Sequence, residues 1–563
     1  MTDAKEQLSY VQEQDTGTTN ETVVVIKSEV ELVNFLVDIL CFGDCVDEAD
    51  LEKDNSFKIL YSLLKRSSVV TIAIEDKYVD RVYRDSYYMH FSCKHGEYSR
   101  FCKRLFIFKG DVFENAGDRA FSELDVLKLQ KRFIGTVVIR PLREGKVGRS
   151  LINPYFVLGE KDTYLRFARY SATIYGMRLY VNAFPFSMQD GETTTCAEIT
   201  ILVLMDYFSR KYSEYRSILP SDIADIVGKN DFERTLPSRG LKYALITKVF
   251  SEEGFYPRLY SYGRNAFADM SQFKRVMHYY IESGIPVAVG AKVDEKTRHS
   301  IVCIGHGRIN YDNIKKKIYA VYDTDAGTGN YIWLVDSSDL CNNYIVMDDG
   351  HTPYENYEWK SEISHNVEKK DRCKLENYEP EMLMVPLYKR MFLEAQDAYD
   401  ICTSTLASRM AGIQRFYPEM GTKQNPVVIR LFMCSSRNYK QRRIANLGPE
   451  NKDISDRYKE LRLPRFIWVC EIYDEKSYCE GKAKGELVID ATASPDHGTK
   501  SILLIHYPHN ILVCRKNIED VEKHFGINEK FQKFDKWESF KGYDHNLFMP
   551  KTANQHMNSK LEI

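Results

Sequence analysis

Apolar side chains recur at helical spacing in the middle of this 563-residue chain. Between Ile199 and Phe208 they fall on one face of a 3.6-residue period, and a polar, turn-prone run precedes them. Thr194 or Thr195 occupies the position where a helix N-cap is expected. The pattern predicts an amphipathic helix that begins at or near Cys196.

Three later runs of apolar residues are short and end at turns, which is typical of buried strands. The first covers residues 285–291, the second 299–305 and the third 344–349. His299 opens the second strand, and the third ends in a pair of carboxylates. A potential nucleophile, a potential base and a potential carboxylate partner therefore each stand at the end of a predicted element.

The same reasoning predicts elements in the rest of the chain. We expect a short strand and a helix within 21–41, and strands at 68–74, 135–141, 427–432, 465–472, 485–490 and 501–506. Two strands around the turn at 323–329 are expected to extend the sheet that carries His299. Residues 381–410 are rich in helix-forming side chains, which predicts a helix.

These elements predict an α+β protein of two or three domains. We expect a disordered N-terminus at 1–20 and an N-terminal α/β domain at 21–165. The elements with Cys196 and His299 are expected to form one domain at 166–395. A C-terminal domain at 396–563 should combine a helix with several strands.

Composition narrows the class of protein. The 78 Lys and Arg residues nearly balance the 80 Asp and Glu residues, so we expect neither nucleic acid nor a membrane surface as a partner. No run of about 18 apolar residues and no secretory signal pattern is present in the sequence. Thirteen cysteines are too sparse for a disulfide scaffold. We expect a cytoplasmic protein with reduced thiols.

The order of the polar residues points to acyl transfer. A helix N-terminus favours the thiolate, which is the nucleophilic form of a cysteine such as Cys196. His299 is the candidate base, and Gln189 carries an amide that could stabilise an oxyanion. Asp348 is the candidate partner of the imidazole, with Asp349 as the alternative. A single cysteine on an amphipathic helix is usually a small buried hydrophobe, so the hypothesis depends on all these residues together.

The segments resemble the papain-like cysteine peptidase superfamily, most closely its bacterial branch similar to the peptidases that process double-glycine leader peptides. The matching segments, in chain order, are QDGETTTCAEIT, SGIPVAVGA, HSIVCIGHG and YIVMDDG. The resemblance covers roughly residues 180 to 355. It departs where the family has a proline after the aspartate, because Asp349 and Gly350 stand there.

The resemblance implies a two-subdomain core, with a helical part that carries Cys196 and an antiparallel sheet that carries His299 and Asp348. It implies a cysteine-dependent hydrolase that cleaves a peptide or amide bond through a thioester, with a protein or peptide as substrate and no cofactor. Two alternatives stay open. They are a transglutaminase-like acyltransferase and a catalytically inactive papain-like module used for binding.

Other polar residues are less informative. Cys93, His95 and Cys102 have no fourth ligand at a useful spacing, so we expect no metal site. His306 and His351 lie near strand ends, where exposure to solvent is expected. The sequence does not indicate an oligomeric state or the identity of a substrate.

Overall fold

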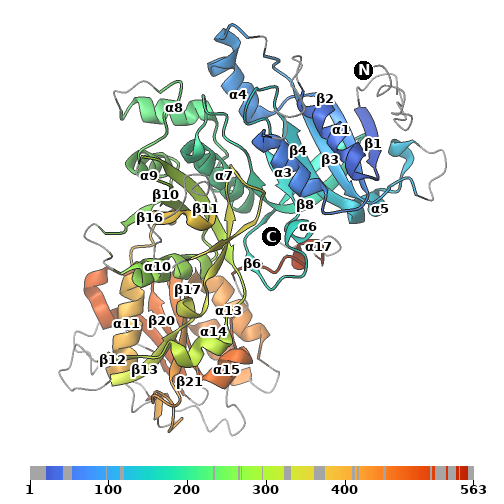
Figure 1. Ribbon diagram of the computed structural model, residues 1–563. Helices are drawn as coiled ribbons and strands as arrows, with labels where there is room; N and C mark the ends of the chain where they lie inside the picture. Colours follow the sequence, from blue (N-terminus) through green and yellow to red (C-terminus); the bar gives the residue numbers. More distant parts are fainter. Residues whose placement is uncertain are drawn as a thin grey trace.

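The computed structural model (Figure 1) describes most of the chain. The described residues are 21–41, 53–96, 98–114, 120–231, 235–263, 267, 269–294, 296–322, 331–359, 375–408, 413–414, 417–447, 452–507, 510–513, 528–529, 540–543 and 546–555. The predicted disordered segment 1–20 lies outside them. Within these ranges, no helix has the length and apolar character needed to cross a membrane.

The fold is of the mixed α+β class, with several mostly antiparallel sheets, as the sequence predicts. The first, here called the N-terminal sheet, has seven strands and is flanked by the helices α1 and α3. Its elements are β1 (Glu21–Ile26), α1 (Glu29–Leu40), α3 (Asn55–Leu64), β2 (Val70–Tyr78), β3 (Cys102–Lys109), β4 (Phe133–Ile139), β5 (Ser150–Ile152), β7 (Ala168–Ile174) and β8 (Met177–Phe186).

The order of this sheet is β1-β2-β3-β4-β5-β8-β7. The sheet therefore continues past the predicted domain boundary at residue 165, because β8 pairs with β5 and β7 closes the edge. Its apolar side chains also share one core with the helix that follows Cys196. The N-terminal sheet is thus part of the body that holds the candidate site.

The central sheet contains the three strands expected around the candidate site. Its order is β15-β14-β11-β10-β16-β9, with β6 paired to the end of β11. All of its pairs are antiparallel. Its strands are β6 (Tyr164–Leu165), β9 (Arg258–Ser261), β10 (Val287–Lys292), β11 (Arg298–His306), β14 (Asn343–Met347), β15 (Glu355–Glu358) and β16 (Glu379–Val385).

The predicted helix at 381–410 is only partly correct. Residues up to Val385 form β16, and the helix α11 (Ala395–Ser408) begins ten residues later. Leu383 pairs with Val289 of β10 and is completely buried. Long-range pairing in the sheet therefore overrides the local helix preference of this segment.

The C-terminal sheet has eight strands in the order β12-β13-β17-β18-β20-β21-β22-β23. They are β12 (Tyr319–Tyr322), β13 (Tyr331–Asp336), β17 (Val427–Ser435), β18 (Phe466–Tyr473), β20 (Gly485–Asp490), β21 (Ile502–Tyr507), β22 (Asn510–Val513) and β23 (Asn528–Glu529). The prediction for β12 and β13 is wrong, because they extend this sheet and not the sheet that carries His299. β13 runs parallel to β17, and Ile332 and Leu334 are buried in its core.

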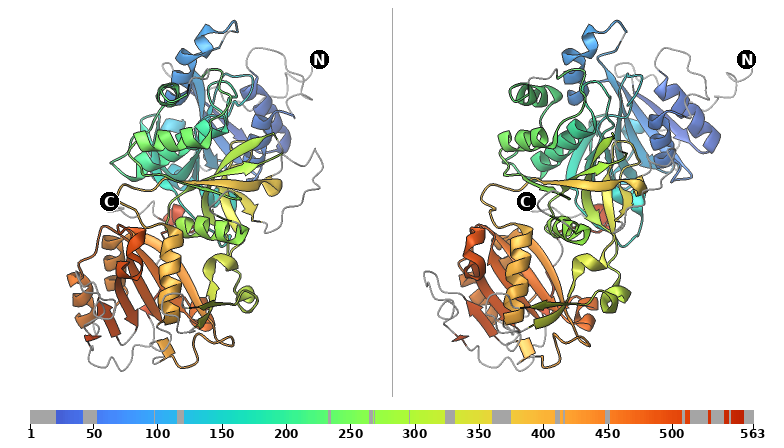
Figure 2. Two further views of the ribbon diagram at one scale, coloured as in Figure 1. Left: turned by 90° about the vertical axis from the view of Figure 1, so that its left-hand side faces the viewer. Right: turned by 60° about the vertical axis from the view of Figure 1, so that its left-hand side comes forward.

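Two long helices cover opposite faces of the central sheet. Side chains alternate along β11, with Val302 and Ile304 in the core that includes α7 (Cys196–Lys211). Ile301 and Cys303 belong to the other core, which includes α10 (Met270–Glu282). Figure 2 shows α10 between the central and C-terminal sheets, and it contacts both β11 and β17. The layers are therefore α7, central sheet, α10 and C-terminal sheet.

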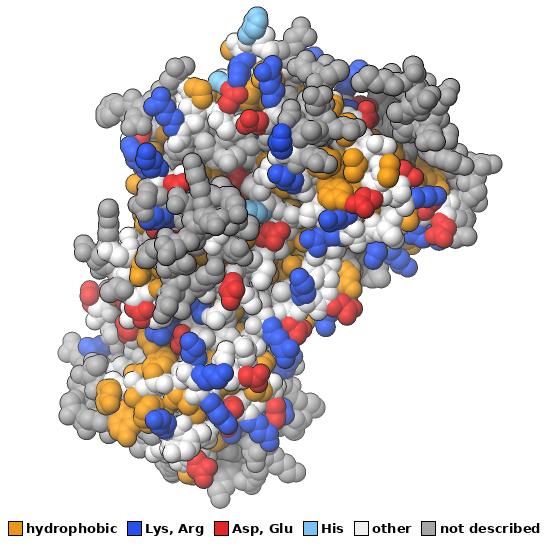
Figure 3. Space-filling model, viewed as in Figure 1, with side chains coloured by type: hydrophobic (Ala, Val, Ile, Leu, Met, Phe, Trp, Pro, Cys, Tyr) orange, Lys and Arg blue, Asp and Glu red, His pale blue; other side chains and the backbone are white. Residues whose placement is uncertain are grey.

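The last described residues, 546–555, pack against residues of the N-terminal half of the chain. The backbone of Phe548 pairs with Leu165, and the Asn182 amide donates to the carbonyl of Ala553 at 2.8 Å. Figure 1 shows α17 (Thr552–Gln555) beside α6 (Pro154–Leu158). On the face shown in Figure 3, Lys and Arg side chains alternate with Asp and Glu.

A chain of buried ion pairs joins α10 to the C-terminal sheet. Arg430 on β17 contacts Glu282 of α10 at 2.8 Å and Glu471 of β18 at 3.0 Å. Arg443 contacts Glu471 at 2.8 Å and Glu486 of β20 at 2.5 Å. Each of these side chains is at most 6% exposed. Charges this deeply buried are tolerated only as pairs.

Replacing Arg443 with methionine would leave the carboxylates of Glu471 and Glu486 with one cation fewer. We expect Arg443→Met to lower the free energy of unfolding by roughly 3–5 kcal/mol. Urea unfolding followed by tryptophan fluorescence would measure it, since Trp468 lies buried in the same sheet. Arg437→Met is the control, because Arg437 is exposed on the same helix, α13 (Ser436–Ala445). Equal effects of the two substitutions would contradict the importance of the network.

Candidate functional site

The helix α7 begins at Cys196, as the sequence predicts. Thr195 is its N-cap, and the Thr195 backbone N–H donates to the Glu198 carboxylate at 3.0 Å. The preceding turn is wound around Asp190, whose carboxylate accepts the backbone N–H groups of residues 192–194 at 2.7–2.9 Å. The half-buried Cys196 side chain therefore stands at the capped, positive end of the helix.

One hydrogen bond aligns this helix with the strand that carries His299. Thr200, one turn after Cys196, donates from Oγ1 to Oγ of Ser300 at 3.0 Å. Ser300 directly follows His299 on β11, and both hydroxyl side chains are buried. The Cys196 thiol lies close enough to the His299 imidazole to contribute to the raised pKa of that ring. The structure thus brings together the predicted nucleophile and the predicted base.

Two carboxylates face the same nitrogen of His299. Nε2 lies 3.0 Å from Oδ1 of Asp348 and 3.2 Å from Oδ1 of Asp349. This arrangement leaves Nδ1 as the ring nitrogen for the Cys196 thiol. Burial disfavours the charged imidazole, but the contacts with Asp348, Asp349 and Cys196 outweigh it, so the pKa of His299 lies well above its usual value. These contacts therefore favour the protonated form of the ring.

The two aspartates differ in their surroundings. Burial alone would raise the pKa of Asp348, but the imidazoles of His299 and His351 hold this pKa well below its usual value. Nδ1 of His351 lies 3.1 Å from Oδ2 of Asp348. Burial and the neighbouring Asp348 charge raise the pKa of Asp349, against the opposing effect of His299. Asp348 is thus the ionised partner of the imidazole, and Asp349 is a second contact.

Gln189 lies in the loop beside these groups. Its backbone lies close enough to the buried carboxylate of Asp349, at the end of β14, to lower the pKa of that carboxyl slightly. Its carbonyl group packs against Gly145, where a Cβ atom would come within 2.0 Å of the oxygen. The buried Arg140 donates to the neighbouring carbonyl of Met188 at 2.8 Å. The loop is therefore packed between the hairpin that contains Arg140 and Gly145 and the end of β14.

A tyrosine approaches the site from the helical side. Tyr243 begins α9 (Tyr243–Glu252), and its hydroxyl packs on Gly290 of β10, where a Cβ atom would lie 1.9 Å from it. Burial raises the pKa of Tyr243 to about 12, with smaller contributions from Glu381 and Cys196. The phenol is therefore neutral, and it adds a hydrogen-bonding group near the sulfur.

The N-terminal sheet also contributes to the site. Asn55, at the start of α3, donates from its amide to the carbonyl of Gly350 at 2.8 Å, directly after the aspartate pair. Glu192, in the loop before Cys196, contacts His90 at 2.8 Å and Lys94 at 2.5 Å. These residues brace the two loops that carry Gln189 and Asp349.

Several of these supporting residues were not predicted. The Asp-Gly pair at 190–191 is a turn signal, and it is the only local sign of the role of Asp190. Asn55, Thr200 and Ser300 carry no local signal, because their partners lie far away in the sequence. The expected exposure of His306 is wrong, since its side chain is fully buried at the end of β11 and contacts Glu282 at 3.0 Å. His351 is 30% exposed.

One cluster has the composition of a metal site. His299, Asp348 and Asp349 offer ligand atoms within 4.8 Å of one another, and they are the only such group among the described residues. Cys93, His95 and Cys102 therefore do not converge. A cation at the cluster would take the place of the proton on Nε2, so it would compete with the interaction between His299 and Asp348.

Comparisons with known proteins do not assign this chain to a family. The chain matches no protein-family model, and neither curated proteins nor solved structures give a significant match.

The charge on His299 can be tested without a substrate. The ratio of the rates at which iodoacetate and iodoacetamide alkylate Cys196 reports a nearby positive charge, because only iodoacetate is an anion. This ratio should fall as His299 loses its proton at alkaline pH. Since Asp348 raises the pKa of His299, Asp348→Asn should move that fall to lower pH. Asp349→Asn should move it in the same direction by less, and an unchanged profile in Asp348→Asn would contradict the assignment.

Proposed function

We propose that the protein is a cysteine-dependent hydrolase that cleaves a peptide or amide bond, with Cys196, His299 and Asp348 as its catalytic triad. The observation that supports the proposal is the convergence of three groups: Cys196 at the start of α7, the nearby His299 imidazole, and the buried Asp348 carboxylate 3.0 Å from Nε2 of that ring. The sulfur stands at the start of a capped helix, and the imidazole that would act as its acid and base lies beside it.

The proposed core is papain-like. The nucleophile stands on a helix, and the base and carboxylate stand on neighbouring strands of an antiparallel sheet, β11 and β14. This is the division into a helical part and a sheet that the sequence resemblance implies. In the same proposal, the N-terminal sheet braces the loops of the site and the C-terminal sheet lies beyond α10.

The reaction would proceed in two acyl-transfer steps. The Cys196 thiolate attacks the carbonyl carbon, and the imidazolium of His299 gives a proton to the leaving amine. His299 then accepts a proton from water, which attacks the thioester and releases the carboxylic acid, so that the Cys196 thiolate and the imidazolium of His299 are restored. Asp348 holds the ring orientation and stabilises its charged form through both steps.

The oxyanion of each tetrahedral intermediate needs donors beside the sulfur. The backbone N–H of Cys196 is one of the first N–H groups of α7, which have no partner within the helix. The Gln189 side chain is the proposed second donor, on a loop that Arg140 holds through the carbonyl of Met188. Removing such a donor costs about 3 kcal/mol of transition-state stabilisation in other enzymes.

Selective alkylation tests the nucleophile. We expect Cys196 to react with iodoacetamide near neutral pH at least about tenfold faster than the exposed thiols Cys93 and Cys479, because of these three only Cys196 lies beside the proposed catalytic imidazole. Peptide-resolved mass spectrometry would give each rate. His299→Gln should abolish the difference, whereas Tyr322→Ala, at an exposed site on the C-terminal sheet, should leave it intact.

Equal reactivity of the three thiols would favour a catalytically inactive binding module. If Cys196 is hyperreactive, a trapped thioester separates the remaining alternatives. Addition of a primary amine should yield amide product from a transglutaminase-like acyltransferase, and only the acid from a hydrolase. Comparison of the proteomes of cells that express the wild type or Cys196→Ala would then identify the cleaved substrates.

A further inference from the structure

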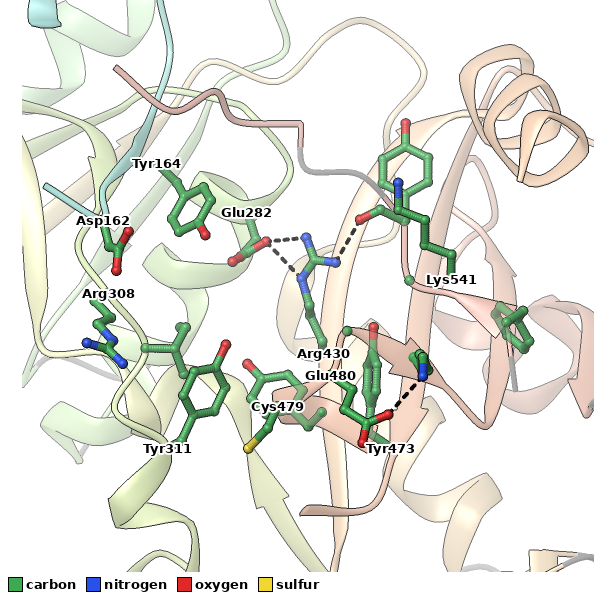
Figure 4. A pocket seen from close by; sticks show the side chains of 17 residues that line it. Asp162, Tyr164, Glu282, Arg308, Tyr311, Arg430, Tyr473, Cys479, Glu480 and Lys541 are labelled. Carbon is green, nitrogen blue, oxygen red and sulfur yellow. Dashed lines mark hydrogen bonds and ion pairs between the residues drawn. The ribbon is translucent and has the colours of Figure 1, made fainter. Parts of the chain in front are cut away.

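A large cavity lies between the central sheet and the C-terminal sheet, outside the candidate active site. Its volume is about 810 Å³, within the range of cavities that bind small molecules. Figure 4 shows Tyr164 and Tyr311 on the side of the central sheet, and Tyr473 and Lys541 on the side of the C-terminal sheet. The pair of Glu282 and Arg430 lies between the two sides.

The walls of this cavity are unusually rich in aromatic rings. Three of them form a connected group, in which Tyr478 lies edge-on to Tyr311 at 5.7 Å and to Tyr473 at 5.2 Å between ring centroids. Tyrosine presents an apolar face and a hydroxyl that donates and accepts hydrogen bonds. The complete set of aromatic residues that line the cavity is Tyr164, Tyr311, Tyr473, Tyr478, Phe540 and Tyr543.

The charged groups in the cavity are largely neutralised by one another. Arg430 is held between Glu282 and Glu471, and Lys482 contacts Glu480 at 3.0 Å. The other charged residues of the lining are Asp162, Arg308 and Lys541. The cavity is therefore lined by both signs of charge without a concentration of either. A ligand with several phosphates would require convergent cations that are not already engaged by carboxylates. A compact cation would require convergent carboxylates that are not already engaged by cations.

We propose that this cavity binds an uncharged oligosaccharide. The apolar C–H faces of sugar rings pack against aromatic side chains, and sugar hydroxyls pair with phenols and with both members of an ion pair. The volume suits a ligand of about two or three sugar rings. This site is separate from the proposed hydrolase site and does not depend on it.

Calorimetric titration with three defined probes tests the proposal directly. The probes are maltotriose, cellotriose and triacetylchitotriose, with ATP as the charged comparison. We expect at least one trisaccharide to bind and ATP not to bind. Tyr311→Ala should weaken that binding by about tenfold or more, because it removes a ring from the half-buried wall. Tyr322→Ala, at an exposed site on β12 of the C-terminal sheet, should not change it.

An exposed thiol in the cavity wall reports where the probe binds. Cys479 lines the cavity, whereas the equally exposed Cys93 lies in the N-terminal part of the chain. The bound trisaccharide should slow alkylation of Cys479 at mildly alkaline pH and leave the rate at Cys93 unchanged. Failure of all three trisaccharides to bind, binding of ATP alone, or equal affinity in Tyr311→Ala would overturn the proposal. None of these results bears on the reactivity of Cys196.

Discussion

The packing of α7 against β11 is the contact on which the candidate site depends. Cys196 and His299 belong to different layers, and the buried hydrogen bond between Thr200 and Ser300 sets how far the helix is displaced along the strand. A shift of one helical turn would carry the thiol away from the imidazole. Because the bond lies out of water and between well-packed side chains, it holds one alignment and not a range of them.

The sequence was sufficient for the parts of the site that have local signals. The start of α7 follows from a capping residue and helical periodicity, and β10, β11 and β14 follow from short apolar runs that end at turns. No local pattern in the sequence indicates which sheet a predicted strand will join. The apolar pattern of β12 and β13 is compatible with either neighbouring sheet, and only the parallel pairing of β13 with β17 decides between them.

Charged residues were the hardest to place from sequence. Charged residues are normally expected at the surface. Four of them are instead buried together between α10 and the C-terminal sheet: Glu282, Arg430, Arg443 and Glu471. A charged side chain is tolerated in the interior only when it forms an ion pair, and the residues of these ion pairs come from separate parts of the chain. The same limit applies to Asp348 and Asp349, whose pKa values shift in opposite directions because His351 contacts Asp348, while burial and the Asp348 charge act on Asp349.

The route of the chain between β11 and β14 has a mechanical consequence. After the strand of His299, the backbone leaves for the C-terminal sheet, forms β12 and β13 there, and then returns to build the strand that leads to Asp348. The strands that carry the base and lead to its carboxylate are therefore both connected directly to the C-terminal sheet, on the far side of α10. Any displacement of that layer pulls on both strands at once, so distant forces can change the spacing between imidazole and carboxylate.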